Sequence, residues 1–234
     1  RFEIQRLAGR GGMGAVYRAL DRSQRAPVAV KILGGLSEGD QARFRQEAQI
    51  LAELRHPGIV RYVAHGATND GFPFLALEWL EGEDLDDRLT RGPLPPRDAL
   101  LLARRVADAL GAAHQRGIVH RDVKPTNLFL PGGEVSAVKV LDFGVARVGA
   151  APSLTRTGFV VGTWAYMAPE RLLAKAAPSQ RTEVYALAGV LYECLTGTTL
   201  LRHRRPSRTH RSVTDRPGSV PKPARSRTTR SEIG

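Results

Sequence analysis

The chain has 234 residues, 42% hydrophobic and 25% charged, which is typical of a folded protein with a sizeable core. A single cysteine, Cys194, excludes a disulfide framework, so we expect it to be a small buried hydrophobe and the protein to reside in a reducing, cytoplasmic compartment. No apolar run reaches the about 18 residues of a membrane span, and no signal peptide is visible. Because the first residue is Arg1 and not Met, we expect an excerpt of a longer or processed protein, whose other parts could carry a membrane anchor.

The formal net charge of +12 is unevenly distributed along the chain. Residues 202–234 hold ten Lys or Arg and two acidic residues, so this segment contributes +8 and the other 201 residues only +4. The segment has no helical or strand period and too few aliphatic residues to offset its ordering entropy, so we predict that residues 201–234 are a disordered basic tail. The tail lacks the interleaved aromatic residues of a nucleic-acid stacking site. Binding of nucleic acid or anionic lipid is therefore the disfavoured alternative.

Residues 1–80 are predicted to form a strand-rich region with one helix. Alternating or β-branched runs predict strands at residues 2–9, 14–20, 27–33, 56–66 and 72–80. Apolar residues recur at helical spacing within residues 39–54, and the face that we expect to be buried holds Phe44, Ala48, Leu51 and Leu54.

Residues 81–200 are predicted to be mainly helical. Residues 95–117 begin with prolines and form a helix whose apolar face holds Leu102, Val106, Leu110 and Ala113. Short strands follow at residues 127–130 and 137–141, and residues 144–169 are irregular. Residues 182–197 predict a helix that is apolar almost all round, as expected in the centre of a lobe.

A glycine cluster, "GRGGMG", lies between the first two predicted strands. Gly9, Gly11 and Gly14, followed by Val16, would let the backbone approach a phosphate. A Rossmann site would need a helix directly after the glycines, whereas a strand follows here. The pattern therefore indicates a flap between two strands, with a plain flexible hairpin as the alternative.

Three polar residues lie in or next to predicted apolar strands. Lys31 lies in the middle of an apolar strand and needs a partner, for which Glu47 on the following helix is the candidate; an edge strand with a solvated Lys is the alternative. Asn127, in "HRDVKPTN", and Asp142, in "LDFG", could supply oxygen ligands for Mg²⁺, although Asp142 could also cap a turn.

The order of these motifs, closed by "MAPE" at residues 167–170, resembles that of a eukaryotic-like serine/threonine protein kinase of the bacterial type. The resemblance covers roughly residues 1–197. It implies an α+β, bilobal protein-kinase fold with a strand-rich N-lobe at residues 1–80 and a helical C-lobe at residues 81–200 that lacks its last helices.

The resemblance also implies an ATP and Mg²⁺ site. Lys31 would hold the α- and β-phosphates, Glu47 would hold Lys31, and Asn127 with Asp142 would bind Mg²⁺. The full ATP site would comprise Leu7, Gly9, Gly11, Gly14, Val16, Ala29, Lys31, Leu77, Glu78, Leu80, Phe129 and Asp142.

The implied catalytic residue is Asp122, which would accept the proton of a substrate hydroxyl while Lys124 neutralises charge on the phosphoryl group. The flanking cations favour the ionised form of Asp122, which suits a base that orients the hydroxyl and takes its proton late. Arg121 would meet a phosphate on the irregular segment, where Thr155 and Thr157 resemble autophosphorylation sites. Thr163 resembles a residue that marks Ser/Thr specificity. The implied partners are protein substrates and a second copy for autophosphorylation.

Two features depart from the family pattern. Glu183 stands where the family usually has Asp to brace the catalytic loop, and the sequence does not decide whether the extra methylene is absorbed. The pattern also stops near Gly197, which leaves Glu170 without its usual Arg and the central helix with exposed apolar surface. We interpret the end of the chain as a truncation or an out-of-frame reading. A catalytically silent kinase-like scaffold is therefore the alternative to an active enzyme.

Overall fold

The computed structural model describes residues 1–11, 14–34, 37–143, 163–173 and 175–200. All of these residues belong to one compact unit, Arg1–His203. The predicted tail at residues 201–234 lies outside the described part of the chain, as do Thr155 and Thr157. None of the described helices combines the length and apolar character that crossing a membrane requires.

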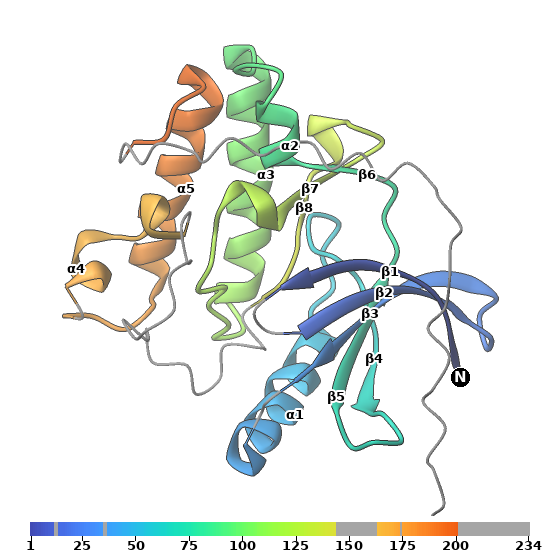
Figure 1. Ribbon diagram of the computed structural model, residues 1–234. Helices are drawn as coiled ribbons and strands as arrows, with labels where there is room; N and C mark the ends of the chain where they lie inside the picture. The colour runs from blue at the N-terminus through green and yellow to red at the C-terminus, as the bar shows by residue number, and fades with distance from the viewer. Residues whose placement is uncertain (12–13, 35–36, 144–162, 174, 201–234) are drawn as a thin grey trace, which may run out of the picture. The chain divides into compact units, whose positions relative to one another are not determined.

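The first part of the chain folds into a five-stranded antiparallel sheet (Figure 1). Its spatial order is β1-β2-β3-β5-β4. The strands are β1 (Phe2–Gly11), β2 (Gly14–Asp21), β3 (Ala26–Leu33), β4 (Tyr62–Ala67) and β5 (Pro73–Glu78). All five predicted strands are therefore present, although β4 begins only at Tyr62.

The two faces of the sheet differ in burial because side chains alternate along each strand. In β3, Val28 and Val30 are 2% and 4% exposed and pack in a small core with Ala19 and Ala76. Ala29 and Lys31 lie on the opposite face of β3 and are half-buried. One face of the sheet is thus committed to packing, and the other is partly open.

Gly14 is required by the fold itself. Its φ angle is +137°, which L side chains rarely adopt, and a Cβ atom there would lie 2.0 Å from the carbonyl oxygen of Ile32. The close approach of β2 to β3 therefore explains this glycine without any ligand. By contrast, a Cβ atom at Gly9 would meet nothing within 4 Å.

Helix α1 (Glu38–Glu53) follows β3 and packs against β4. The side chain of Ser37 caps its first turn by accepting the Asp40 N–H at 3.2 Å. The predicted buried face is confirmed, since Phe44, Ala48, Leu51 and Leu54 are all at most 9% exposed.

The second part of the chain begins with two elements that the sequence did not predict, β6 (Gly82–Asp84) and α2 (Leu85–Leu89). Gly82 has a φ angle of +144°, and a Cβ atom would lie 2.2 Å from the Leu130 carbonyl oxygen, so only glycine fits. The predicted long helix is α3 (Pro96–His114), with proline in its first turn. Its expected face is buried, since Leu102, Val106, Leu110 and Ala113 are at most 3% exposed.

A three-stranded sheet, in the order β6-β7-β8, joins β6 to two strands that come after α3 in the chain. Its other strands are β7 (Leu128–Pro131) and β8 (Lys139–Val140), as predicted. Short helical turns complete this part of the chain: η1 (Pro125–Asn127), η2 (Val135–Ala137), η3 (Thr163–Tyr166) and α4 (Pro169–Leu172).

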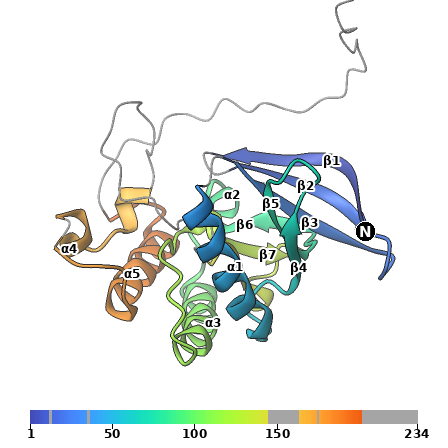
Figure 2. The ribbon, with the colours of Figure 1, turned by 90° about the horizontal axis from the view of Figure 1, so that it is seen from below.

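Helix α5 (Gln180–Thr196) packs against α3, and Figures 1 and 2 show the two helices side by side. A capping box between Ser179 and Thr182 starts the helix, and Gly197, in the left-handed region, ends it. Its buried face includes Glu183, Ala186, Val190, Glu193 and Cys194.

One face of α5 is exposed within the described part of the chain, as expected from the missing pattern after Gly197. Val184 is 66% exposed, and Tyr192 and Leu195 are each 41% exposed. The buried side behaves as predicted: Cys194 is fully buried, and this burial raises the pKa of its thiol to about 12. Cys194 is therefore an unreactive core residue.

Candidate active site

Three of the predicted catalytic residues lie together at residues 120–127, the loop between α3 and β7. The carboxylate of Asp122 contacts the ammonium group of Lys124, with 2.9 Å between Oδ2 and Nζ. The side-chain amide of Asn127 donates to the backbone carbonyl of Asp122 at 2.7 Å and to its carboxylate at 3.2 Å. The carbonyl of Asn127 accepts the N–H of Leu141, directly before Asp142, at 2.8 Å. These bonds fix the predicted base, cation and metal ligand relative to one another.

The backbone at Arg121 is held in an unfavourable conformation. Its φ angle is +71°, in the left-handed region that non-glycine residues rarely adopt. Side chains bind both of its backbone polar groups: the N–H donates to Glu183 at 2.6 Å, and the carbonyl accepts from Arg171 at 3.1 Å. Strained backbone persists only where its surroundings over-determine it. These contacts therefore fix the direction of the chain at Asp122, and sequence reasoning missed the role of Arg171.

The predicted ion pair between Lys31 and Glu47 is replaced by two others. Lys31 Nζ lies 2.9 Å from Asp142 Oδ2, and Arg121 Nη1 lies 2.9 Å from Glu47 Oε1. The Lys31 side chain is only 17% exposed and requires a counter-charge, which either carboxylate can supply. Sequence spacing cannot rank the two carboxylates, because the choice depends on how α1 is placed relative to β3. Arg121, predicted to meet a phosphate, binds Glu47 here.

The predicted apolar walls of the nucleotide site share one face of the five-stranded sheet. Val16 is directly opposite Lys31, and Ala29 is directly opposite Leu77. Cross-strand partners project to the same face, and so do residues two apart in one strand. All four therefore lie on the partly open face of the sheet. Phe129 comes from β7 in the second sheet, where it is half-buried.

The structure places Leu7 on a different face from the other predicted nucleotide contacts of the sheet. Leu7 pairs with Tyr17, whereas Gly9 pairs with Val16, and the register shifts between these two pairs. The shift inserts Ala8, so Leu7 projects to the face of Tyr17 and away from that of Val16. Its side chain is 43% exposed. The resemblance implied Leu7 as an ATP contact, and a β-bulge leaves no mark in the sequence that would indicate this change of face.

The connection between the two parts of the chain, residues 78–81, is called the hinge. Glu78 is hydrogen-bonded through both its backbone and its side chain. Its N–H donates to the Arg61 carbonyl at 2.9 Å. Its carboxylate accepts from the Arg61 N–H at 2.8 Å and from Lys139 Nζ at 2.6 Å. Because the Glu78 N–H already donates to Arg61, only the backbone carbonyl of Glu78 could bind the edge of an adenine ring. Leu80, predicted as the other adenine contact, is half-buried in the hinge.

The sequence model described as the protein kinase domain matches residues 2–231. The chain belongs to the protein kinase domain family. The match extends past Gly197, near which we expected the family pattern to stop.

Relatives and a solved structure agree with this assignment. The kinase domain is 42% identical over 200 residues to serine/threonine-protein kinase PknH of Mycobacterium bovis, covering 84% of this chain and 33% of PknH. It is 40% identical over 200 residues to PknD of Mycobacterium tuberculosis, covering 84% of this chain and 30% of PknD. It is 26% identical to the crystal structure of Rad53 1–466 in complex with AMP-PNP, with a TM-score of 0.69, covering 85% of this chain and 49% of that chain. The kinase domain thus spans about a third of the length of the two curated relatives.

The donor set of the kinase domain fits Mg²⁺. The amide nitrogen of Asn127 is committed to Asp122, because both of its partners there are acceptors, so a metal would be bound by the amide oxygen. Asp142 adds a carboxylate that is 42% exposed. One carboxylate, one amide oxygen and phosphate oxygens are the ligands that Mg²⁺ takes in nucleotide sites.

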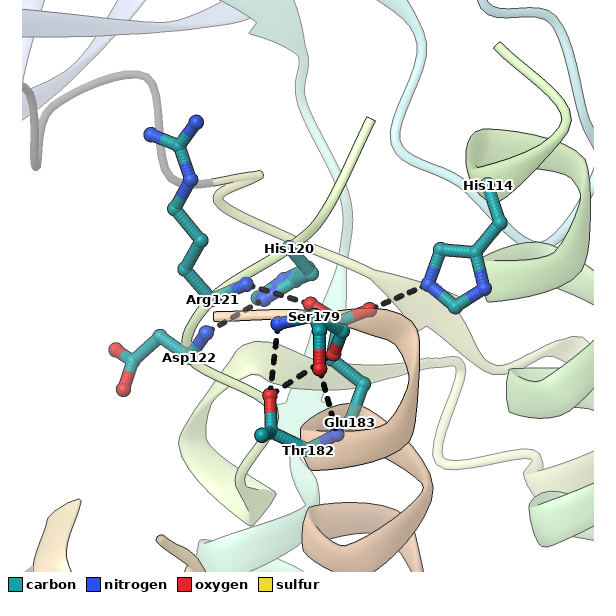
Figure 3. A network of polar contacts seen from close by, with 7 residues as sticks. All are labelled: His114, His120, Arg121, Asp122, Ser179, Thr182 and Glu183. Atoms are coloured by element: carbon teal, nitrogen blue, oxygen red, sulfur yellow. Dashed lines mark hydrogen bonds and ion pairs between the residues drawn. The ribbon is translucent and has the colours of Figure 1, made fainter. Parts of the chain in front are cut away.

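The carboxylate of Glu183 anchors the catalytic loop to α3 and α5 (Figure 3). One oxygen accepts the Arg121 N–H, and the other lies 2.7 Å from Nε2 of His114. Glu183 is only 3% exposed, so these bonds lie in a nearly dry environment. Glu183, which is one methylene longer than the family's Asp, is therefore accommodated, and its carboxylate also reaches His114.

Replacing Glu183 with Ala should destabilise the kinase domain, because it leaves the Arg121 N–H and the His114 ring without this acceptor. A buried donor that loses its partner costs about 1–3 kcal/mol, so we expect the free energy of unfolding to fall by about 2–4 kcal/mol. Val184, the next residue of α5, is 66% exposed, and V184A should change this free energy by about 0.5 kcal/mol or less. Denaturant titration measures both, and equal stability of the two variants would contradict this role of Glu183.

His120 is fully buried and connects the catalytic loop to Leu141. Its Nε2 lies 2.6 Å from the Leu141 carbonyl oxygen, and its Nδ1 lies 3.2 Å from the Asp122 nitrogen. A carbonyl only accepts and an N–H only donates, so a neutral ring with its proton on Nε2 satisfies both partners. Burial lowers the pKa of His120, which agrees with this neutral state. Periodicity gave no signal for this role.

The stability of the kinase domain should depend on pH through His120. Because the pKa of His120 is lowered in the folded state, the unfolded chain takes up the proton first as pH falls through about 6.5. The free energy of unfolding is therefore highest above that pH and falls below it, by up to about 1.4 kcal/mol per pH unit for one proton. H120Q should remove this part of the slope. Denaturant titrations between pH 7.5 and 5 at about half-unit steps compare the two, and identical slopes would contradict the expected change.

The remaining predicted residues lie in the irregular segment or directly after it. Thr163 begins η3, whereas Thr155 and Thr157 lie outside the described residues. Among the described residues, none of the ion pairs includes the Glu170 carboxylate.

Proposed function

We propose that the chain transfers the γ-phosphate of ATP to serine and threonine hydroxyls of protein substrates. The observation that carries this proposal is the cluster of Asp122, Lys124 and Asn127, whose side chains meet within 3.2 Å. It combines a proton acceptor, a cation and a metal ligand, which is the set that phosphoryl transfer requires. The serine/threonine-protein kinases among the relatives support this choice of reaction.

Lys31 and Asp142 would hold the nucleotide. The ammonium group of Lys31 supplies positive charge for the α- and β-phosphates, and Val16 and Ala29 on the same sheet face supply apolar contact for adenine. Asp142 and Asn127 would bind Mg²⁺, which when bound neutralises phosphate charge. Because Lys31 and Asp142 now contact each other at 2.9 Å, ATP would have to exchange this ion pair for contacts with phosphate and metal.

The chemical step would take place at Asp122. Its carboxylate accepts a hydrogen bond from the substrate hydroxyl, whose oxygen attacks the γ-phosphorus while the bond to the β–γ bridging oxygen breaks. The hydroxyl proton passes to Asp122, and ADP leaves. Lys124, held 2.9 Å from Asp122, neutralises charge on the moving phosphoryl group. In this loose transition state, orientation contributes more than base strength.

Phosphate transfer from radiolabelled Mg-ATP to a generic basic protein tests the proposal. We expect label in added substrate and, through a transient pair of copies, in Thr155 or Thr157 of the chain itself, located by mass spectrometry. A folded chain that binds nucleotide but transfers no label would support the silent scaffold instead. Label in the chain at other positions alone would reject the two threonines as autophosphorylation sites.

A further inference from the structure

Trp79, in the hinge, contacts two arginines of the β1–β2 hairpin. Cζ of Arg6 lies 5.5 Å and Cζ of Arg18 lies 5.7 Å from the centroid of the Trp79 ring. Both distances are within the about 6 Å reach of a cation–π interaction. The indole N–H donates to Glu81 at 2.6 Å. One half-buried ring of the hinge therefore binds both strands of the hairpin that carries the glycine cluster.

This contact compensates for an unfavourable pair of charges. Arg6 and Arg18 are directly opposite each other in the β1–β2 ladder. Like charges at such positions destabilise a sheet. The electron-rich face of Trp79 attracts both guanidinium groups, and Glu81 adds a negative charge at the indole N–H. The two arginines are thus stabilised where they are by the hinge.

The contact also lies next to the proposed adenine site. Arg18 is opposite Ala29, and Ala29 is opposite Leu77, so these three residues form a row across one face of the sheet. Val16 and Lys31 form the next row on the same face. A contact that fixes Arg18 therefore also fixes the position of Val16 over the nucleotide.

We propose that Trp79 is a positioning residue that docks the β1–β2 hairpin onto the hinge before nucleotide binds. This inference rests on the proposed function, which gives the hairpin a ligand to cover. A hairpin that is already docked loses less conformational freedom when the ligand binds, so affinity rises without a new contact to the ligand. The transfer step depends on Asp122 and Lys124 in the catalytic loop, so kcat does not depend on this docking.

Two substitutions of Trp79 separate docking from general packing. W79L removes the aromatic face but keeps an apolar side chain, whereas W79F keeps an aromatic face. We expect W79L to raise KM for ATP about three- to tenfold while kcat changes less than about twofold. Amide exchange in residues 2–21, measured without nucleotide, should become faster in W79L. W79F should restore most of the KM and most of the protection.

The arginines provide a coupled control. In an R6A/R18A background, W79L should have no further effect on KM or on hairpin exchange, because its partners are gone. Arg22 lies at the end of the same hairpin and is 69% exposed in a surface pair with Glu3, so R22A should behave like the wild type.

The outcomes distinguish this inference from the proposed function. A wild-type chain that binds no nucleotide would defeat the proposed function alone, since hairpin exchange without nucleotide still tests the docking. Unchanged exchange and KM in W79L would overturn the inference. The inference would also be overturned if W79L lowered kcat and thermal stability while raising KM, and W79F did the same. That pattern is the one expected of a purely structural residue.

Discussion

Asp122→Asn should reduce kcat for phosphorylation of a protein hydroxyl by about 10²- to 10⁴-fold, the range typical of a lost general base. The dissociation constant for Mg-ATP should change by less than about twofold. The amide has the shape of the carboxylate but cannot take up the hydroxyl proton, and it loses the ion pair with Lys124, which the structure places at 2.9 Å. The nucleotide contacts assigned to Lys31 and Asp142 do not involve Asp122.

Asp108→Asn is the matched control for this change. Asp108 is exposed on α3, outside the catalytic loop, and the substitution removes the same charge. Steady-state kinetics gives kcat, and calorimetry gives the nucleotide affinity of each variant. An Asp122→Asn variant that keeps kcat within about tenfold of the wild type would contradict the role of Asp122 as base.

Asp142→Asn should abolish most of the magnesium dependence of nucleotide binding. With excess Mg²⁺, we expect the affinity for ATP to fall by about 100-fold, because a carboxylate ligand of the metal is lost. Without Mg²⁺, the affinity should be equal to or tighter than that of the wild type, since the substitution removes a negative charge near the triphosphate and releases Lys31 from its ion pair.

The opposite signs of these two effects make the test specific. General damage to the site would weaken binding with and without the metal. Asp70→Asn, an exposed acid in the turn between β4 and β5, serves as the charge control and should match the wild type in both buffers. Equal weakening of ATP binding in the presence and absence of Mg²⁺ would contradict the assignment of Asp142 as a metal ligand.

Much of the fold follows from local patterns. The buried faces of α1 and α3 could be predicted because 3.6-residue periodicity places Phe44 and Ala48, or Leu102 and Val106, on one side of a helix. The strands could be predicted because alternation is a local property. The three residues of β6 (Gly82–Asp84) are too few to show a clear alternation, and this strand was missed.

The partners of the charged residues could not be predicted, because they depend on how distant elements pack. Lys31 needed a carboxylate, and the spacing offered Glu47, but the structure pairs it with Asp142. The fit of Glu183 depends on the position of His114, 69 residues earlier in the chain. No periodic signal encodes either contact.

The nucleotide face shows the same limit at closer range. Val16, Ala29 and Lys31 could be assigned to one face because the β2–β3 ladder is regular. Leu7 could not, because the bulge before Gly9 reverses the alternation. The contact of Trp79 with Arg6 and Arg18 likewise requires the register of β1 and β2, which composition does not reveal.

We propose that the cluster around Asp122 and the pair Lys31–Asp142 form one site for a magnesium-bound nucleotide. Calorimetric titration of the folded chain with AMP-PNP in excess Mg²⁺ tests it most directly. We expect saturable binding of one nucleotide per chain. Absence of detectable heat and of any thermal stabilisation by the nucleotide, in protein that unfolds cooperatively, would contradict it.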